Sequence, residues 1–119
     1  MNEKISMDKI KNDLKQFIGT EHYYSDFMGL KLTDGVKYFA EKYSANWLVS
    51  DAAVIVMMKL KNHPFISLDV NISDKETIFN YTDGNDNVLF KQKYSLVDLP
   101  NGSLKFFISN GVMMLPSEY

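Results

Sequence analysis

The 119-residue sequence predicts an α+β fold, with about three N-terminal helices packed on a C-terminal antiparallel sheet of about five short strands. Two observations predict it. Apolar residues recur at helical spacing as far as about residue 60, and after Pro64 they alternate with polar residues, as in strands with one wet face. Helices followed by strands favour two segregated layers over alternating βαβ units. The length suits a single domain spanning residues 1–119.

The first predicted helix runs from residue 7 to Gly19, with Ser6 as its N-cap and Gly19 as its terminator. Apolar side chains at helical spacing form one stripe along it: Met7, Ile10, Leu14, Phe17 and Ile18. Residues 20–32 show no clean period. We expect a loop there, with a short extended piece.

A second helix is predicted to begin at Thr33 and Asp34, because a hydroxyl caps a helix start and a carboxylate favours its positive end. The segment 45–60 is apolar on more than one side, which indicates a buried central helix. Its β-branched run at residues 54–56 would also suit a buried strand, although the length of the segment and the lack of glycine or proline before Pro64 favour helix. Helix and strand therefore both stay open for residues 52–60.

The sheet is predicted from strict alternation of apolar and polar residues after Pro64. The loop at residues 83–87 separates two of the strands and is rich in residues that tolerate left-handed backbone. The expected strands cover residues 66–72, 77–81, 88–94, 104–109 and 112–115.

Composition excludes several functional classes. There is no cysteine, which removes disulfides and thiolate chemistry and suits a reducing, cytoplasmic location. No apolar run approaches the length that spans a bilayer, so we expect no membrane insertion. The net charge is −2, so we expect no basic face for nucleic acid. Every one of the 13 basic residues is lysine, so no arginine can bind a phosphate or a base through paired hydrogen bonds. Direct nucleic-acid binding is therefore not expected.

Catalytic and metal-binding motifs are missing from the sequence. The loop at residues 83–87 carries oxygen ligands, but its glycine stands second rather than sixth, and Tyr94 stands where an EF-hand needs a glutamate. His22 and His63 are the only histidines, and neither has a second ligand at metal-binding spacing. No nucleophile motif or phosphate loop occurs. We expect no catalytic residue, no metal and no cofactor.

Two compositional features bear on binding. The pairs at residues 57–58 and 113–114 are methionines, which either fill the core or form an adaptable binding surface. Aromatic residues make up 13% of the chain, and tyrosine is enriched in the centres of protein interfaces. The aromatic content favours protein binding over catalysis.

Four segments carry a family resemblance: GTEHYY at residues 19–24, LTDGVKY at 32–38, Trp47-Leu48 followed by Asp51, and NGVMMLPSEY at 110–119. Together they resemble an uncharacterised family of short bacterial proteins associated with phages, plasmids and other mobile elements. The resemblance implies no catalytic residues, because the family has no assigned activity. It implies a setting in which small acidic proteins bind and block a host machine.

The first hypothesis is a non-enzymatic protein-binding module, an anti-CRISPR-like inhibitor of a bacterial defence system whose partner is a host or phage protein. The expected contact residues are exposed tyrosines and acidic residues: Glu21, Tyr23, Tyr24, Asp26, Glu118 and Tyr119. The alternative is a small enzyme or ligand binder with a pocket around His22, served by Glu21 and Asp34. A homodimer through an edge strand or the third helix is a further possibility.

Overall fold

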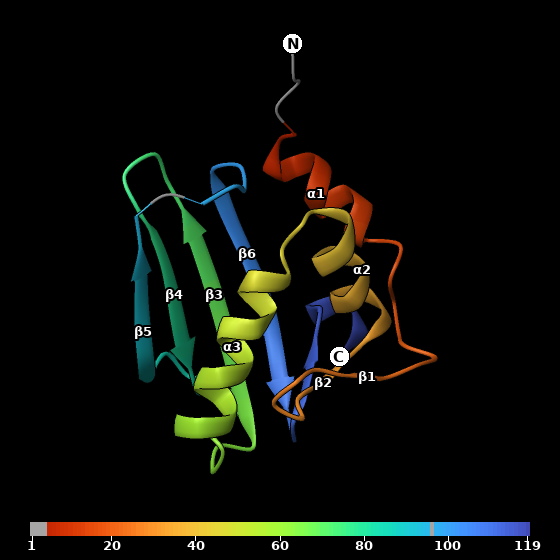
Figure 1. Ribbon diagram of the computed structural model, residues 1–119, viewed down its shortest axis with the longest axis vertical. Coiled ribbons are helices and arrows are strands. Elements are labelled where there is room, and N and C mark those ends of the chain that lie inside the picture. The colour runs from red at the N-terminus through yellow and green to blue at the C-terminus, as the bar shows by residue number, and fades with distance from the viewer. Residues whose placement is uncertain (1–4, 96) are drawn as a thin grey trace.

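The computed structural model describes residues 5–95 and 97–119, and its fold is α+β, as predicted (Figure 1). Three α-helices accompany one seven-stranded sheet with the strand order β1-β2-β7-β6-β3-β4-β5. The helices are α1 (Met7–Leu14), α2 (Asp34–Lys42) and α3 (Asn46–Lys59), and a 3₁₀ turn, η1 (Pro116–Glu118), ends the chain. The strands are β1 (Tyr24–Ser25), β2 (Lys31–Leu32), β3 (Phe65–Ile72), β4 (Thr77–Thr82), β5 (Val88–Tyr94), β6 (Gly102–Ser109) and β7 (Val112–Met114).

The five C-terminal strands occur where alternation predicted them, and two further short strands lie in residues 20–32, where a loop with one short extended piece was expected. β1 and β2 lie between α1 and α2, so the helices do not all precede the sheet. β2 runs parallel to β7, which makes the sheet mixed. Each of the two strands has only two residues, too few to show a period. Backbone pairing forms them: the amide of Lys31 donates to Gly111 and that of Thr33 to Met113.

Helix α1 ends at Leu14 rather than at the predicted Gly19. The side-chain amide of Gln16 donates to the carbonyl of Asp13, which would otherwise accept from the amide of Phe17 in a continuing helix. Phe17 donates to Leu14 instead. Ile18, expected on the apolar stripe, is 84% exposed. The predicted N-cap is confirmed, since Ser6 accepts from the amide of Lys9.

The segment 45–60 is helix, which settles the open choice for residues 52–60. α3 is buried on several sides, as its apolar composition predicted, although Met58 is exposed. The indole of Trp47 packs on Phe79 of β4 and Tyr94 of β5, with ring centroids 6.0 and 5.8 Å apart. The hydroxyl of Tyr94 donates to Asp51 at 2.7 Å. α3 is thereby held against the far strands of the sheet.

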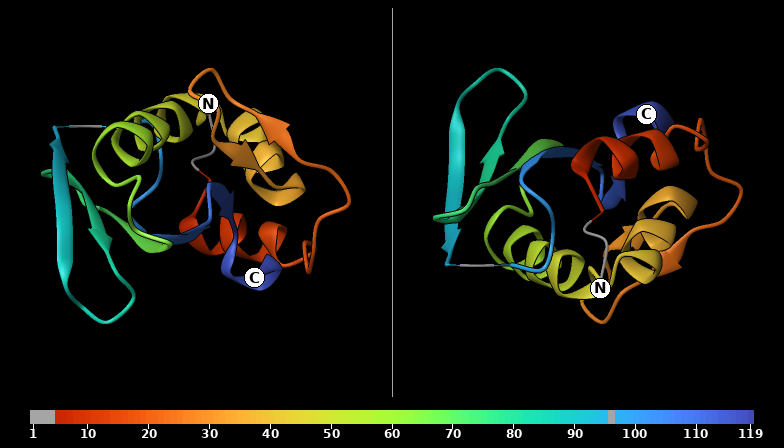
Figure 2. Two further views of the ribbon diagram at one scale, coloured as in Figure 1. Left: turned by 90° about the horizontal axis from the view of Figure 1, so that it is seen from below. Right: turned by 90° about the horizontal axis from the view of Figure 1, so that it is seen from above.

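One face of the central strands carries the core. In β3 the buried residues are Ile66, Leu68, Val70 and Ile72, and β6 places Leu104, Phe106 and Ile108 beside them. Helix α2 reaches this face through Phe39, whose ring lies 5.4 Å from Phe106. Figure 2 shows the β4–β5 hairpin projecting to one side of the molecule, away from α1 and α2.

The opposite face of the sheet is only partly exposed to solvent. Asn71 is exposed as predicted, but Ser67 is buried, and its neighbour in register on β6 is Phe107. Phe107 forms an aromatic cluster with Phe65 and Tyr119, in which ring centroids lie 5.1 to 5.6 Å apart. The last residue of the chain therefore covers part of the sheet's outer face.

Candidate functional site

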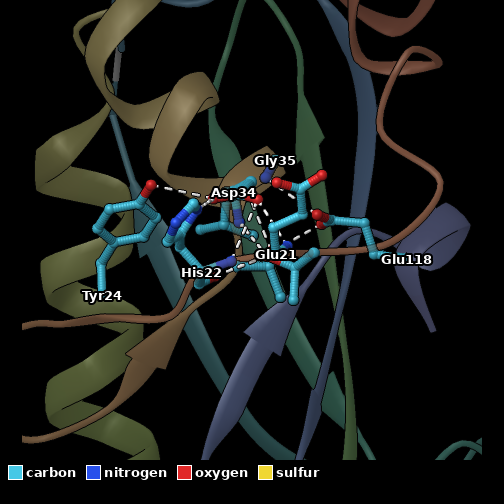
Figure 3. Close-up of polar contacts among 9 residues, drawn as sticks. Glu21, His22, Tyr24, Asp34, Gly35 and Glu118 are labelled. Atoms are coloured by element: carbon cyan, nitrogen blue, oxygen red, sulfur yellow. Dashed lines mark hydrogen bonds and ion pairs between the residues drawn. The ribbon is translucent and has the colours of Figure 1, made fainter.

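The candidate site is the start of helix α2, where residues from distant parts of the chain meet (Figure 3). Asp34 receives three hydrogen bonds from the preceding loop. Its carboxylate accepts from the amides of Glu21 at 2.9 Å and His22 at 3.4 Å, and from the hydroxyl of Tyr24 at 3.0 Å. Its own amide donates to the hydroxyl of Thr20 at 2.8 Å. The loop is thus fastened to the first residue of the helix.

Glu118 brings the C-terminal end of the chain to the same helix start. Its carboxylate accepts from the hydroxyl of Thr33 at 2.7 Å, the amide of Gly35 at 3.0 Å and the amide of Leu115 at 3.0 Å. A Cβ atom on Gly35 would lie only 2.6 Å from Leu115 and 2.7 Å from Glu118. The approach of the C-terminal turn therefore favours glycine at position 35, because a larger residue would displace the side chains of Leu115 and Glu118.

The first amides of a helix have no intrahelical acceptor and form the positive end of its dipole, so two carboxylates are stabilised here. The hydrogen bond from the Glu21 amide, with the Tyr24 hydroxyl, holds the pKa of Asp34 below its ordinary value. The Asp34 carboxylate raises the pKa of the Tyr24 phenol. Asp34 therefore stays an anion that anchors the loop.

His22 lies at the edge of this arrangement. Its side chain is 69% exposed, and its Nδ1 atom lies 3.8 Å from Asp34, beyond hydrogen-bond distance. Two cavities, of about 540 and 750 Å³, are lined by other residues. Asp34 already accepts three hydrogen bonds, so its carboxylate has a structural role. His22 is an exposed imidazole beside that carboxylate.

The predicted contact residues divide into two groups. Glu21, Tyr23 and Tyr119 are exposed, with 60% of Tyr23 and 73% of Tyr119 accessible. Tyr24, Asp26 and Glu118 are half-buried, and their polar groups bond within the chain. The structure brings Glu21, Tyr24 and Glu118 to the start of α2, whereas the ring of Tyr119 lies on the outer face of the sheet.

Asp26 fixes the turn between β1 and β2. One of its carboxylate oxygens accepts from the amides of Met28 and Leu30, both at 2.9 Å. Gly29 closes the turn with a φ of +89°, a conformation that favours glycine. The turn presents Phe27, which is 71% exposed and was not among the predicted contact residues. Its Asp-x-x-Gly pattern is typical of a β-turn and would have indicated an exposed aromatic at the tip.

A second polar cluster joins α1 to α2 and was also missed. The carboxylate of Asp13 accepts from the hydroxyls of Tyr38 at 2.9 Å and Tyr43 at 2.6 Å, and Lys42 lies 3.2 Å away. Burial, together with the hydrogen bond to Asp13, raises the pKa of Tyr43 to about 12. The Tyr43 hydrogen bond in turn lowers the pKa of Asp13. The cluster fastens the two helices together.

Residues 5–95 and 97–119 contain no cluster of three or more potential metal-ligating side chains. In the loop at residues 83–87, the carboxylate of Asp83 accepts from the amides of Asn85 and Asn87 and from the side chain of Asn87. Those bonds hold the hairpin turn itself. Nor does the described chain include a helix of the length and apolarity that crossing a membrane needs.

The fold and the site define an α+β protein in which a loop and the C-terminal turn are anchored at one helix start. Comparison with family models gives one match, a family of unknown function (DUF6876), over residues 8–119. The chain therefore belongs to this family. Neither curated proteins nor solved structures gave a match.

Three of the four segments that carried the resemblance meet at the start of α2: residues 19–24, 32–38 and 110–119. The fourth, from Trp47 to Asp51, packs α3 on the sheet. Membership of a family of unknown function is confirmed, while the association with bacteria and mobile elements stays a prediction.

Proposed function

We propose that this protein is a non-enzymatic protein-binding module whose main contact surface is the anchored loop, defined as residues 20–30. The observation that carries the proposal is the combination of exposed aromatic side chains with a fixed backbone. Tyr23 and Phe27 are largely accessible, while Asp34 and Asp26 hold the backbone on either side of them.

A fixed backbone matters because binding costs free energy whenever a flexible segment becomes ordered. The anchored loop has already lost that freedom in the folded chain. Its rings therefore offer a partner large contact areas at a low entropic cost, as tyrosine does in many binding loops. Exposed Glu21 adds a negative charge beside them, which favours a partner with a basic surface.

The specific partner that we propose is a host or phage protein, with inhibition of a bacterial defence system as the role. This finer step rests on the resemblance to a family associated with mobile elements and on the mildly acidic balance of the chain. The anchored loop supports the inhibitor role because a small, rigid and partly acidic surface suits a blocking contact.

The test compares a double variant, Tyr23→Ala with Phe27→Ala, with the wild-type chain in affinity capture from a bacterial host lysate. Met58→Ala is the matched control, since Met58 is an exposed apolar side chain on α3 outside the loop. The proposal expects one stoichiometric partner that wild type and control retain and the double variant loses. Equal capture by all three chains, or no partner at low salt, contradicts it.

The inhibitor role has its own test. Phages are plated on cells that carry a defence system, with and without expression of the chain. We expect wild type and Met58→Ala to restore plating and the loop variant to fail. The alternative with a ligand pocket around His22 stays a prediction. His22→Ala separates the two hypotheses, because the exposed imidazole should contribute little to a contact centred on the two rings.

A further inference from the structure

Strand β6 is paired over its whole length on one side only. β3 runs beside residues 102–109, whereas β7 on the other side pairs with residues 107–109 alone. Backbone N–H and C=O groups point alternately to the two edges of a strand. Within residues 5–95 and 97–119, the edge of residues 102–106 that faces away from β3 has no strand partner.

The end of β7 explains the open edge. Continued in register, β7 would place Pro116 beside Lys105, but proline has no amide proton to donate. The chain turns into η1 instead, and the bonds of Glu118 to Thr33 and Gly35 draw it towards α2. Among the described residues, no strand therefore pairs with residues 102–106 on the side of β6 that faces away from β3.

A groove of about 540 Å³ lies beside residues 103–105 of β6 and extends over the outer face of the sheet to Asp69 and Asn71 of β3. Helix α1 forms one wall, and Figure 1 shows this helix beside the upper part of β6. The segment 115–117 closes one end. Three almost fully buried leucines contribute to the lining: Leu14, Leu104 and Leu115. The groove thus combines an apolar floor with an open strand edge, and its volume falls within the range of ordinary binding pockets.

The charged side chains of the groove are mostly basic. Lys11, Lys15 and Lys105 line it, against one carboxylate, Asp69. Lys105 lies 3.5 Å from an Asp69 oxygen that accepts no hydrogen bond among the described residues. In that same part of the chain, neither Lys11, in the last turn of α1, nor Lys15, its C-cap, forms an ion pair, and these two ammonium groups four residues apart repel each other.

The position of the two helix lysines has a structural explanation, because cations are favoured near the C-terminal end of a helix. That explanation does not extend to Lys105, which approaches the groove from β6. Three ammonium groups from two elements around one groove leave an excess of positive charge in a chain whose net charge is −2.

We propose that this groove binds an extended, acidic segment of a partner protein, which pairs with residues 102–106 of β6 as an added strand. Five residues of strand span about 17 Å, enough to pair with the open edge. Backbone hydrogen bonds supply the affinity of such strand addition, and side-chain pockets supply the specificity. Alternate apolar residues of the segment cover the leucine floor, and its carboxylates meet the lysines.

The probe is a blocked heptapeptide that alternates glutamate and valine, titrated into the ¹⁵N-labelled chain at low salt. Saturable shifts are expected at the amides of residues 102–106 and of Lys11 and Lys15. A matched peptide with lysine in place of glutamate should give none. Lys11→Gln with Lys15→Gln should weaken binding about fivefold, because two charge pairs are lost. Lys9→Gln, an exposed lysine of the same helix outside the groove, should leave it unchanged.

Two N-methylated forms of the acidic peptide separate strand pairing from simple attraction of anions. Methyl groups on all valine nitrogens block one edge of the peptide, and methyl groups on all glutamate nitrogens block the other. Strand addition uses a single edge, so one form should bind and the other should not. Equal binding of both forms overturns the proposal in favour of an anion site. No saturable shift at about 1 mM peptide, a range in which contacts of about 4 kcal/mol are detected, overturns it as well. Either failure leaves the proposal for the anchored loop unaffected, since that test changes other residues.

Discussion

The carboxylate of Glu118 accepts a hydrogen bond from the amide of Gly35 at 3.0 Å, across 83 residues of chain. The same carboxylate accepts from Thr33, the N-cap of α2, and from Leu115 at the end of β7. One side chain therefore connects the beginning of the second helix with the last strand. Since helix starts leave amides without acceptors, the contact stabilises α2 as well as the C-terminal turn.

Replacing Glu118 tests this connection. Glu118→Ala removes three hydrogen bonds to a charged acceptor and a favourable charge at the helix start, so we expect a loss of about 2 kcal/mol in the free energy of unfolding. Urea denaturation followed by circular dichroism measures it. Glu41→Ala is the control, because Glu41 makes only an exposed pair with Lys37 and should change stability by less than about 0.5 kcal/mol. Equal effects of the two variants would contradict the role of Glu118.

Gly35 offers a test of close packing. A methyl group there would approach the Leu115 Cδ1 atom and the Glu118 carboxylate to less than 3 Å; the Leu115 side chain is almost fully buried, and the carboxylate is held by three hydrogen bonds. We expect Gly35→Ala to destabilise the chain by about 2 kcal/mol, despite the higher helix propensity of alanine. In the control, Gly19→Ala, the new methyl group meets no atom within 4 Å. Thermal unfolding should show a clearly lower midpoint for Gly35→Ala alone, and a midpoint at or above that of wild type would refute the packing argument.

The lowered pKa of Asp34 predicts a dependence of stability on acid. Bonds from Glu21 and Tyr24 favour the charged form in the folded chain, so protons bind more readily to the unfolded chain. The contribution of the Asp34 carboxylate to the stability of the fold is therefore complete above pH 3.8, the ordinary pKa of aspartate, and is lost as the pH falls below that value. We expect the difference in unfolding midpoint between wild type and Asp34→Asn to shrink between pH 7 and pH 3.

The matched control for this pH series is Asp98→Asn, an exposed carboxylate with no hydrogen bond among the described residues. Its effect should be small at every pH. A difference for Asp34→Asn that stayed constant from pH 7 to pH 3 would show that the carboxylate contributes by shape alone.

The parts of the fold that follow from local chemistry were predictable from the sequence. Thr33 caps α2 and Ser6 caps α1, and the alternation after Pro64 marked the strands of the sheet. The end of α1 was missed because it depends on the side chain of Gln16, which competes for a helix carbonyl. β1 and β2 could be anticipated only as one short extended piece, because β2 is held by pairing with β7, about 80 residues further along the chain, as the register of Lys31 with Val112 shows.

The candidate site was predictable only in its residue types. Glu21, Tyr24, Asp26 and Glu118 were expected on a binding surface because tyrosine is enriched in protein interfaces and acidic side chains are mostly exposed. In the structure, the Glu21 amide and the polar groups of the other three fasten the loop and the C-terminal turn, and a contact of these residues with a partner stays a prediction. Nothing local to Glu118 indicates a partner 83 residues away. Tertiary contacts of this kind leave no periodic signal in one sequence.

The cluster between α1 and α2 predicts a loss of stability in alkaline solution. Burial raises the pKa of Tyr43 to about 12 in the folded chain, from an ordinary value of 10.0. Below pH 10 the contribution of the protonated Tyr43 phenol to stability is complete. It is lost as the pH rises from 10 towards 12, because the phenol ionises first in the unfolded chain. Tyr43→Phe removes this ionisation together with the hydrogen bond to Asp13, so its unfolding midpoint should change less than that of wild type between pH 9 and pH 11. Tyr23→Phe, at an exposed position, should follow wild type throughout. Parallel curves for wild type and Tyr43→Phe would show that the hydrogen-bonded pair of Asp13 and Tyr43 does not contribute to stability through the raised pKa of Tyr43.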